Sequence, residues 1–205
     1  MLTLHRVFGF KKGLSANPAK TLEKFGLPAD RELLPALTAL DETVFLKTHR
    51  PANPGDTAPA IYLVRDGRDS VVSLAHYRRG RGHSAIKDLD FDAVLERIIT
   101  RRTANGTWSE NVRSWTDRPG RTAVVRFERL IDDPAAALGG AVDVLGLEVP
   151  KPRVELPSFE ELRARDPVMF RRGKAGTWRT EMSPELEELF WELHGSQMEA
   201  LGYER

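Results

Sequence analysis

Apolar residues form two kinds of run along this chain. Short continuous runs at 43–46, 60–64 and 122–127 are typical of strands that are buried in a parallel sheet. Elsewhere apolar residues recur every three or four positions, which predicts helices over 66–79, 91–99, 108–115, 134–145 and 184–201. Strands that alternate with helices indicate an α/β fold, with a mainly parallel central sheet and helices on both of its faces.

Capping and turn residues mark the ends of several predicted helices. Thr107 and Glu110 have the spacing of a capping box, and Asp133-Pro134 and Ser183-Pro184 are typical helix starts. We expect the polar segment 80–90 to be a mobile loop. The apolar faces predicted to be buried include Val71, Val72, Leu74 and Ala75 in one helix, and Leu186, Leu189, Phe190 and Leu193 in the last.

The 205 residues show no break in composition, so we predict a single domain, with an irregular or helical lead-in over 1–42 and a core over 43–205. The 31 basic and 30 acidic side chains give a net charge of +1, which argues against a nucleic-acid partner. The absence of cysteine excludes disulfides and thiolate ligands, and no metal site is predicted. No run is long enough to span a membrane and the N-terminus lacks a signal-peptide core, so we expect a soluble, cytoplasmic protein.

Basic side chains gather where predicted strands end, which is where ligands bind in parallel α/β sheets. The first cluster is Lys47-Thr48-His49. A histidine past a strand end can act as general base on an alcohol or phenol, and a nearby lysine can offset charge on a leaving oxygen. The alternative is a histidine that bonds only to its own loop beside a solvated lysine.

The second cluster is the segment R-D-G-R-D-S-V-V-S, residues 65–73. Arg65 follows a strand, and Ser73 lies in the second turn of the next helix, so a guanidinium, a hydroxyl and a helix N-terminus can converge on one anion. Asp69 precedes Ser73 by one turn and can cap the helix or orient the basic groups. The alternative is a strand-turn-helix junction with solvated charges.

The third cluster is F-R-R-G-K-A-G-T-W, residues 170–178. Adjacent arginines before a glycine suit a loop that wraps a phosphate, because glycine permits positive φ and a close backbone approach. The alternative is an exposed basic turn. Upstream, Phe159 is an aromatic ring that can lie against a purine, or else a core residue.

In this order, the three clusters resemble the motifs of the sulfotransferases that use 3'-phosphoadenosine-5'-phosphosulfate (PAPS). Residues 62–73 are similar to the family's 3'-phosphate signature, and 170–178 to its R-K-G-x-x-G-x-W motif. K-T-H followed by proline is similar to the segment that bears the catalytic histidine. G-T-W-S-E-N-V-R-S-W and R-F-E-R-L-I-D-D-P add two further matches, so the resemblance covers about residues 43–203.

The resemblance implies a P-loop-type sulfotransferase fold and a role for each matching residue. His49 would be the general base and Lys47 an auxiliary in transfer. The residues implied for the donor's 3'-phosphate are Arg65, Ser73, Arg171, Arg172 and Gly173, and Phe159 would contact adenine. PAPS would be the donor and adenosine 3',5'-bisphosphate (PAP) the product. The acceptor would be a small molecule with a hydroxyl or amine; the motifs specify neither its identity nor an oligomeric state.

The chain also departs from the family's pattern. We find no segment similar to the phosphate loop P-K-S-G-T-T-W; the nearest, residues 10–15, is a poor match. The expectation is therefore an N-terminally incomplete fold, from a truncated gene product or a fragment, whose missing strand would leave apolar sheet surface exposed. Phe127 replaces a usual tyrosine, which removes a hydroxyl donor, and Thr177 replaces a usual aspartate, which we expect to alter only a local turn.

Three functions remain open from the sequence. The first is sulfuryl transfer from PAPS with His49 as base. The second is a catalytically impaired module that binds PAP or PAPS through surviving 3'-phosphate and adenine sites. The third, a P-loop kinase of another substrate, is disfavoured by the K-T-H and R-R-G motifs.

Overall fold

The computed structural model describes residues 22, 23, 26, 28, 30, 32–40, 46–101, 103, 105–147 and 157–205. The chain divides into two compact units, Met1–His49 with Glu148–Leu156, and Arg50–Leu147 with Pro157–Arg205. The prediction of a single domain over residues 1–205 therefore stays a prediction.

The first unit contains helix α3 (Leu33–Thr38). Three of this unit's side chains are buried: Leu22, Ala36 and Leu37. Leu46, the last residue of the first predicted strand, lies in a β-bridge. Residues 43–45 of that strand and the phosphate-loop candidate at 10–15 lie outside the described residues.

The second unit contains a parallel pair of strands, β1 (Ala60–Val64) and β2 (Thr122–Arg126). Their register runs from Ala60 opposite Thr122 to Val64 opposite Arg126. The parallel pairing confirms the predicted sheet type. β2 ends one residue before the predicted end, because Phe127 begins a short helix, α7 (Phe127–Asp132).

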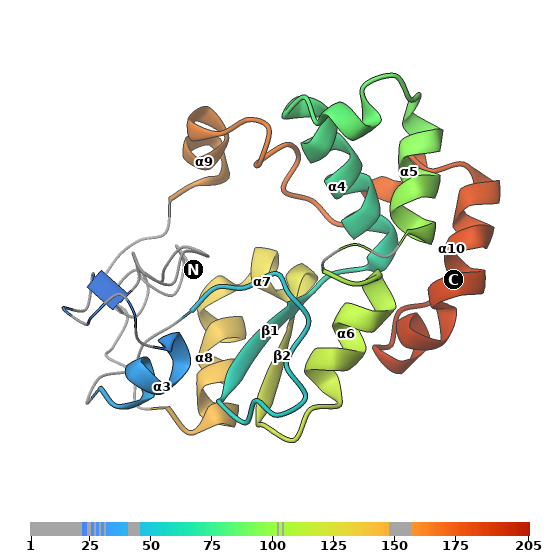
Figure 1. The fold of residues 1–205 in the computed structure, drawn as a ribbon. Coiled ribbons are helices and arrows are strands. Elements are labelled where there is room, and N and C mark those ends of the chain that lie inside the picture. The colour runs from blue at the N-terminus through green and yellow to red at the C-terminus, as the bar shows by residue number, and fades with distance from the viewer. Residues whose placement is uncertain are drawn as a thin grey trace. The chain divides into compact units, whose positions relative to one another are not determined.

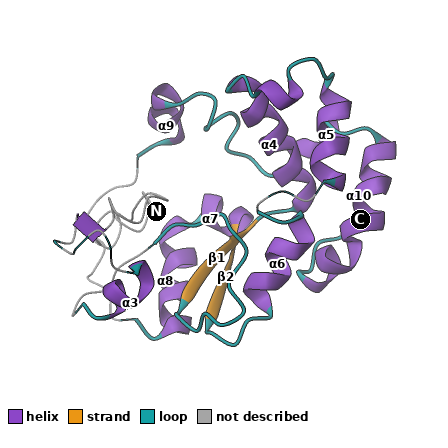
Figure 2. Ribbon diagram, in the orientation of Figure 1, coloured by secondary structure: helices purple, strands orange, loops and turns teal. Residues whose placement is uncertain are grey.

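Helices cover both faces of this pair, as Figures 1 and 2 show for α8 (Pro134–Leu145) and α6 (Trp108–Thr116). On one face Ala123 and Val125 pack with Ala141 and Leu145 of α8. On the other face, the ring of Tyr62 stacks on that of Trp115 of α6, with centroids 6.0 Å apart. The layered α/β architecture expected from the sequence is therefore confirmed.

The expectation that the 60–64 run is buried on both faces is wrong at Leu63, whose exposed fraction is 50%. Val124 of β2 is 43% exposed. Among the described strands, β1 and β2 each have a single neighbour.

A larger core joins three helices, α4 (Gly67–Gly80), α5 (Phe91–Thr100) and α10 (Pro184–Ala200). The predicted faces are mostly confirmed, but Leu74 is 37% and Leu193 47% exposed. The core side of α10 instead includes Trp191, His194 and Met198, because the buried stripe lies further around the helix than the leucine spacing indicated.

The start of α4 packs closely on aromatic rings. A Cβ atom on Gly67 would lie 2.3 Å from the ring of Phe190 and 2.9 Å from that of Trp108. Only glycine therefore lets α4 approach α6 and α10 this closely. Asp66 caps the helix by accepting from the Arg68 N–H.

The remaining helix ends agree with the sequence, with additions. The Thr107–Glu110 capping box and the caps at Asp133 and Ser183 are present as predicted, and a left-handed Gly146 ends α8. The predicted mobile loop 80–90 contains a short 3-10 helix, η1 (Ser84–Ile86), because Ile86 is buried in the core. Two further short helices are α9 (Phe159–Arg165), which begins with a second capping box, and η2 (Thr177–Thr180).

His194 is a buried polar residue in the core. Its Nε2 lies 3.2 Å from the carbonyl oxygen of Ile99, which can only accept, so Nε2 carries the proton. Nδ1 then accepts from the hydroxyl of Ser109 at 2.8 Å. Burial lowers the pKa of His194 below its ordinary 6.5, which keeps the ring neutral.

This burial predicts a loss of stability in weak acid. The unfolded chain takes up a proton near pH 6.5 and the folded ring only at lower pH, so the free energy of unfolding falls as pH drops through 6.5. We expect the melting temperature to fall between about pH 7.5 and pH 5.5, and the slope to be shallower in His194→Gln. The lowered pKa of His76 also makes the free energy of unfolding fall with pH, and it does so equally in the parent chain and in His194→Gln. Equal slopes in thermal melts of both proteins would contradict the assignment.

Candidate functional site: a basic loop clamped to the start of helix α4

Three charged side chains at the start of α4 are buried: Asp66, Arg68 and Asp69 are 8%, 2% and 0% exposed. The guanidinium of Arg68 donates to both carboxylate oxygens of Asp66, to Glu187 and to the backbone carbonyl of Glu204. Arg68 therefore anchors the C-terminal end of the chain to α4. The alternative of solvated charges at this junction is wrong for these three residues.

Asp69 points the other way, toward the basic loop 171–176. Its carboxylate accepts from the backbone N–H of Gly176 at 2.7 Å, from the N–H of Trp178 at 3.0 Å, and from the hydroxyl of Thr177 at 3.0 Å. The helix is capped by Asp66, so Asp69 serves the loop. The expectation that Thr177 affects only a local turn is also wrong, because its hydroxyl reaches a residue 108 positions away.

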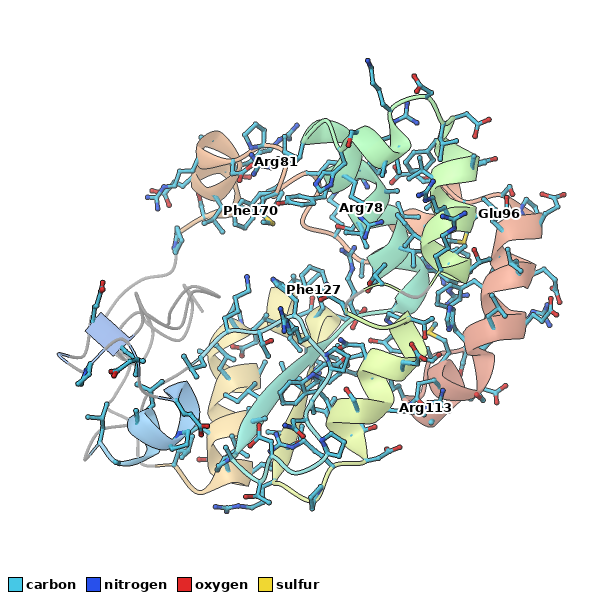
Figure 3. The ribbon with its side chains drawn as sticks, in the orientation of Figure 1. Arg78, Arg81, Glu96, Arg113, Phe127 and Phe170 are labelled. Carbon is cyan, nitrogen blue, oxygen red and sulfur yellow. The ribbon has the colours of Figure 1, made fainter. Side chains whose placement is uncertain are left out.

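Arg65 extends from the end of β1 into the same region. One of its N–H groups donates to the carbonyl of Lys174 at 2.8 Å, and its guanidinium lies 3.3 Å from the Asp69 carboxylate. The guanidinium also lies over the ring of Phe127, 4.5 Å from its centroid. Figure 3 labels Phe127 on α7. The Nε atom of Arg65 is buried and has no hydrogen-bond partner among the described residues.

The two arginines of the basic loop are held by a carboxylate that follows the loop. Arg171 donates to both oxygens of Glu181, at 3.0 and 2.9 Å. Arg172 lies 3.4 Å from the same carboxylate and is 48% exposed. His76 of α4 completes the cluster, with its Nε2 2.5 Å from a Glu181 oxygen. No motif or local spacing links Glu181 and His76 to the two arginines, so this cluster could not be predicted from the sequence.

The pKa values of this cluster follow from burial and the short contacts. Burial raises the pKa of Glu181, but hydrogen bonds from Arg171 and His76 outweigh it, so the pKa lies below its ordinary 4.5. Desolvation lowers the pKa of His76 below 6.5 despite the bond to Glu181. His76 is therefore mainly neutral at pH 7 and donates its Nε2 proton to the carboxylate.

Ser73 is exposed on the face of α4 that carries this loop. It lies one turn after Asp69 and one turn before His76, the two residues that contact the loop from α4. Phe159 packs against the loop from α9: a Cβ on Gly173 would lie 2.4 Å from its ring, and Gly173 has φ of +62°. This close contact requires glycine at 173.

A basic depression of about 610 Å³ lies over the loop. Its lining comprises Arg163, Arg171, Arg172, Lys174, Ala175, Gly176, Thr177 and Thr180. Arg65 and Ser73 are not part of this lining. The structure thus gathers the predicted phosphate residues around one loop and α4, with two arginines in the depression and Arg65 bonded to the loop backbone.

Lys47 and His49 belong to the first unit and are exposed. Desolvation, and to a lesser degree the charge of Lys47, lower the pKa of His49 below 6.5. A histidine that is neutral at pH 7 can accept a proton. Its position relative to the basic depression is not described, so its role stays a prediction.

Two further observations concern the part of the chain that the structure describes. It contains no group of three or more His, Asp or Glu side chains that could hold a metal ion. None of its helices combines the length and the apolar character needed to cross a membrane.

The fold and site define a class: an α/β protein with parallel strands and an arginine-rich loop clamped beside the end of β1. The chain belongs to the sulfotransferase family, since the family model described as "Sulfotransferase domain" matches residues 19–202. This match confirms the resemblance that the motifs indicated.

The chain is also similar to two known proteins. The chain is 22% identical over 151 residues to Cytosolic sulfotransferase 10 of Arabidopsis thaliana, a match that covers 62% of this chain and 45% of that protein. A crystal structure of mouse sulfotransferase SULT7A1 complexed with PAP matches with a TM-score of 0.53 and 22% identity. That match covers 67% of this chain and 57% of the mouse chain, and it shows the shared fold.

The contacts of Asp69 predict a destabilised loop when its charge is removed. In Asp69→Asn one oxygen becomes an NH₂ group, which cannot accept from the Gly176 N–H, so we expect a loss of about 2–4 kcal/mol in the free energy of unfolding. Urea unfolding measures the loss. Asp92→Asn, at an exposed first-turn position of α5, is the matched control and should change stability by less than about 1 kcal/mol. Equal effects in the two variants would show that Asp69 does not clamp the loop.

Proposed function

We propose that this chain binds PAP and PAPS through the clamped basic loop, and that the protein transfers a sulfuryl group from PAPS to a hydroxyl or amine of a small-molecule acceptor. The observation that carries the proposal is the Asp69 clamp, which holds the loop backbone against α4 beside Arg65. Guanidinium groups and a glycine-bearing loop suit a phosphate dianion. The mouse structure, which is complexed with PAP, makes that ligand the natural probe.

In the proposed site, Arg65, Ser73, Arg171, Arg172 and Gly173 receive the 3'-phosphate. Arg65 supports this role with a buried Nε that has no hydrogen-bond partner among the described residues, because such a donor gains a full hydrogen bond from an anion. The ring of Phe159, packed on Gly173, is the proposed contact for adenine.

In the proposed reaction, His49 takes the proton from the acceptor hydroxyl while the acceptor oxygen forms a bond to sulfur. The bond between sulfur and the 5'-phosphate oxygen of PAPS breaks, and PAP leaves with the electron pair. Lys47 offsets the charge that builds on the leaving oxygen. The lowered pKa of His49 supports its role as a base at neutral pH.

A second candidate is a binding module that holds PAP without transfer. It is favoured by the lack of any segment similar to P-K-S-G-T-T-W in the 205 residues. In such a module, the 5'-phosphosulfate of bound PAPS would lack the lysine and backbone N–H groups that the loop supplies. Cytoplasmic location and the absence of nucleic-acid and membrane partners also stay predictions.

PAP binding tests the phosphate site directly. We expect PAP to raise the melting temperature more than adenosine 5'-phosphate does, because only PAP carries the 3'-phosphate. Arg172→Ala should weaken PAP binding by about 1–3 kcal/mol in calorimetry. Arg129→Ala, at an exposed position of α7, is the matched control and should bind normally. If the two ligands stabilise equally, or Arg172→Ala binds as tightly as the control, the phosphate site lies elsewhere.

Turnover tests the role of His49. His49→Ala should keep its affinity for PAP but lose roughly 10²–10⁴-fold in kcat with labelled PAPS and a panel of phenols, alcohols and amines. Unchanged turnover would remove His49 from the mechanism. Tight PAP binding by the parent chain without any measurable transfer would favour the binding module.

A further inference from the structure

Glu181 lies at the end of η2 and is the carboxylate on which the basic side chains converge. Its two oxygens accept from Arg171 at 3.0 and 2.9 Å, lie 3.4 Å from Arg172, and contact His76 Nε2 at 2.5 Å. The Glu181 side chain is only 11% exposed. A carboxylate this buried is stabilised only if its oxygens are paired, and here three cationic or donor side chains pair them.

The contacts of Glu181 leave the arginines available to a ligand. A guanidinium has five N–H donors, and Arg171 gives one from each of two nitrogens to Glu181. Both arginines line the basic depression, and Arg172 is 48% exposed. The carboxylate thus holds one side of each guanidinium while the rest borders the depression.

His76 fixes where this carboxylate sits. Its ring packs on Phe91 of α5, with centroids 4.6 Å apart, and its Nε2 bonds Glu181. This link ties Glu181, just after η2, to the third turn of α4, while Asp69 ties residues 176–178 to the first turn. The two links therefore attach the segment 176–181 to α4 at Asp69 and at His76, and Ser73 lies between these two residues along the helix.

We propose that Glu181 is a positioning residue of the phosphate site: its carboxylate fixes Arg171 and Arg172 at the edge of the basic depression, and His76 ties that carboxylate to α4. Glu181 acts through the arginines and does not touch the ligand. The inference rests on the proposed PAP site. It assigns a function to two side chains, Glu181 and His76, that lie outside the set predicted from the motifs.

The alternative role for Glu181 is a competitor that occupies the place of the anion. It predicts a change in PAP affinity of the opposite sign when Glu181 is neutralised. If Glu181 competes with phosphate or only adds negative charge, its neutralisation tightens PAP binding by removing repulsion. If Glu181 positions the arginines, its neutralisation weakens binding although the site becomes more positive. The sign of the change in Kd therefore separates the two roles.

The test measures PAP affinity by calorimetry for the parent chain and for Glu181→Gln, which keeps the size of the side chain. We expect binding to weaken roughly 5- to 30-fold. Glu192→Gln removes the same charge at an exposed position of α10 and should change Kd by less than about twofold. Circular dichroism and thermal melts check that each variant is folded.

A double-mutant cycle with His76→Phe tests the tie to α4. Phenylalanine keeps the ring against Phe91 but removes the Nε2 donor. Because both residues act through one contact, we expect Glu181→Gln/His76→Phe to bind PAP within about twofold of Glu181→Gln alone. Full additivity of the two losses would overturn the role of His76.

The outcomes separate this inference from the proposed function. If the parent chain prefers PAP to adenosine 5'-phosphate and Glu181→Gln binds PAP equally or more tightly, the positioning role is overturned and the proposed site stands. If the parent chain does not prefer PAP, the proposed site and the positioning role both fall. An arginine side-chain NMR spectrum of the free protein adds a check without ligand: the Arg171 Nε–H signal should shift or broaden in Glu181→Gln and stay unchanged in Glu192→Gln.

Discussion

The buried carboxylate of Asp69 is the constraint from which the site follows. A fully buried charge destabilises a fold by several kcal/mol unless hydrogen bonds and opposite charges compensate it. Here two backbone N–H groups, the Thr177 hydroxyl and the Arg65 guanidinium supply that compensation. Every donor except Arg65 lies on the loop that follows Gly173, so the loop has to pack on α4 for Asp69 to be buried. The position of the basic loop and the stability of the start of α4 therefore depend on each other.

The start of α4 divides this task between neighbouring residues. Arg68 turns to the C-terminal end of the chain, where it lies over the Trp178 ring, 3.8 Å from its centroid, and bonds the Glu204 carbonyl. Asp69 turns to the basic loop. Trp178 takes part in both contacts: its N–H donates to Asp69, and its ring lies under the Arg68 guanidinium. The contacts of the basic loop and of the chain terminus therefore share this residue. A change at either end of this junction is expected to disturb both.

The sequence predicted the features that depend on residues close to one another in the chain. The caps at Thr107, Asp133 and Ser183 depend on residues within three positions, and each was found where expected. It did not predict the Glu181–His76 contact, because the two residues are 105 positions apart and neither lies in a recognisable spacing. The expected burial of Leu63 was wrong for a related reason: the strand's pattern shows that it is apolar, but the elements that pack on that face of the sheet determine whether it is covered.

The pairing of guanidinium groups with carboxylates explains how several arginines can lie close together when no anion is bound. Three guanidinium groups, those of Arg65, Arg171 and Arg172, are paired with two carboxylates, Asp69 and Glu181, which leaves one net positive charge. The carboxylates reduce repulsion in the free protein and fix the guanidinium planes before a ligand arrives. A phosphate would then meet donors already in place, and little side-chain entropy would be lost on binding. Carboxylates in a phosphate site weaken its net charge, yet they increase the fraction of molecules in which that charge is arranged to bind.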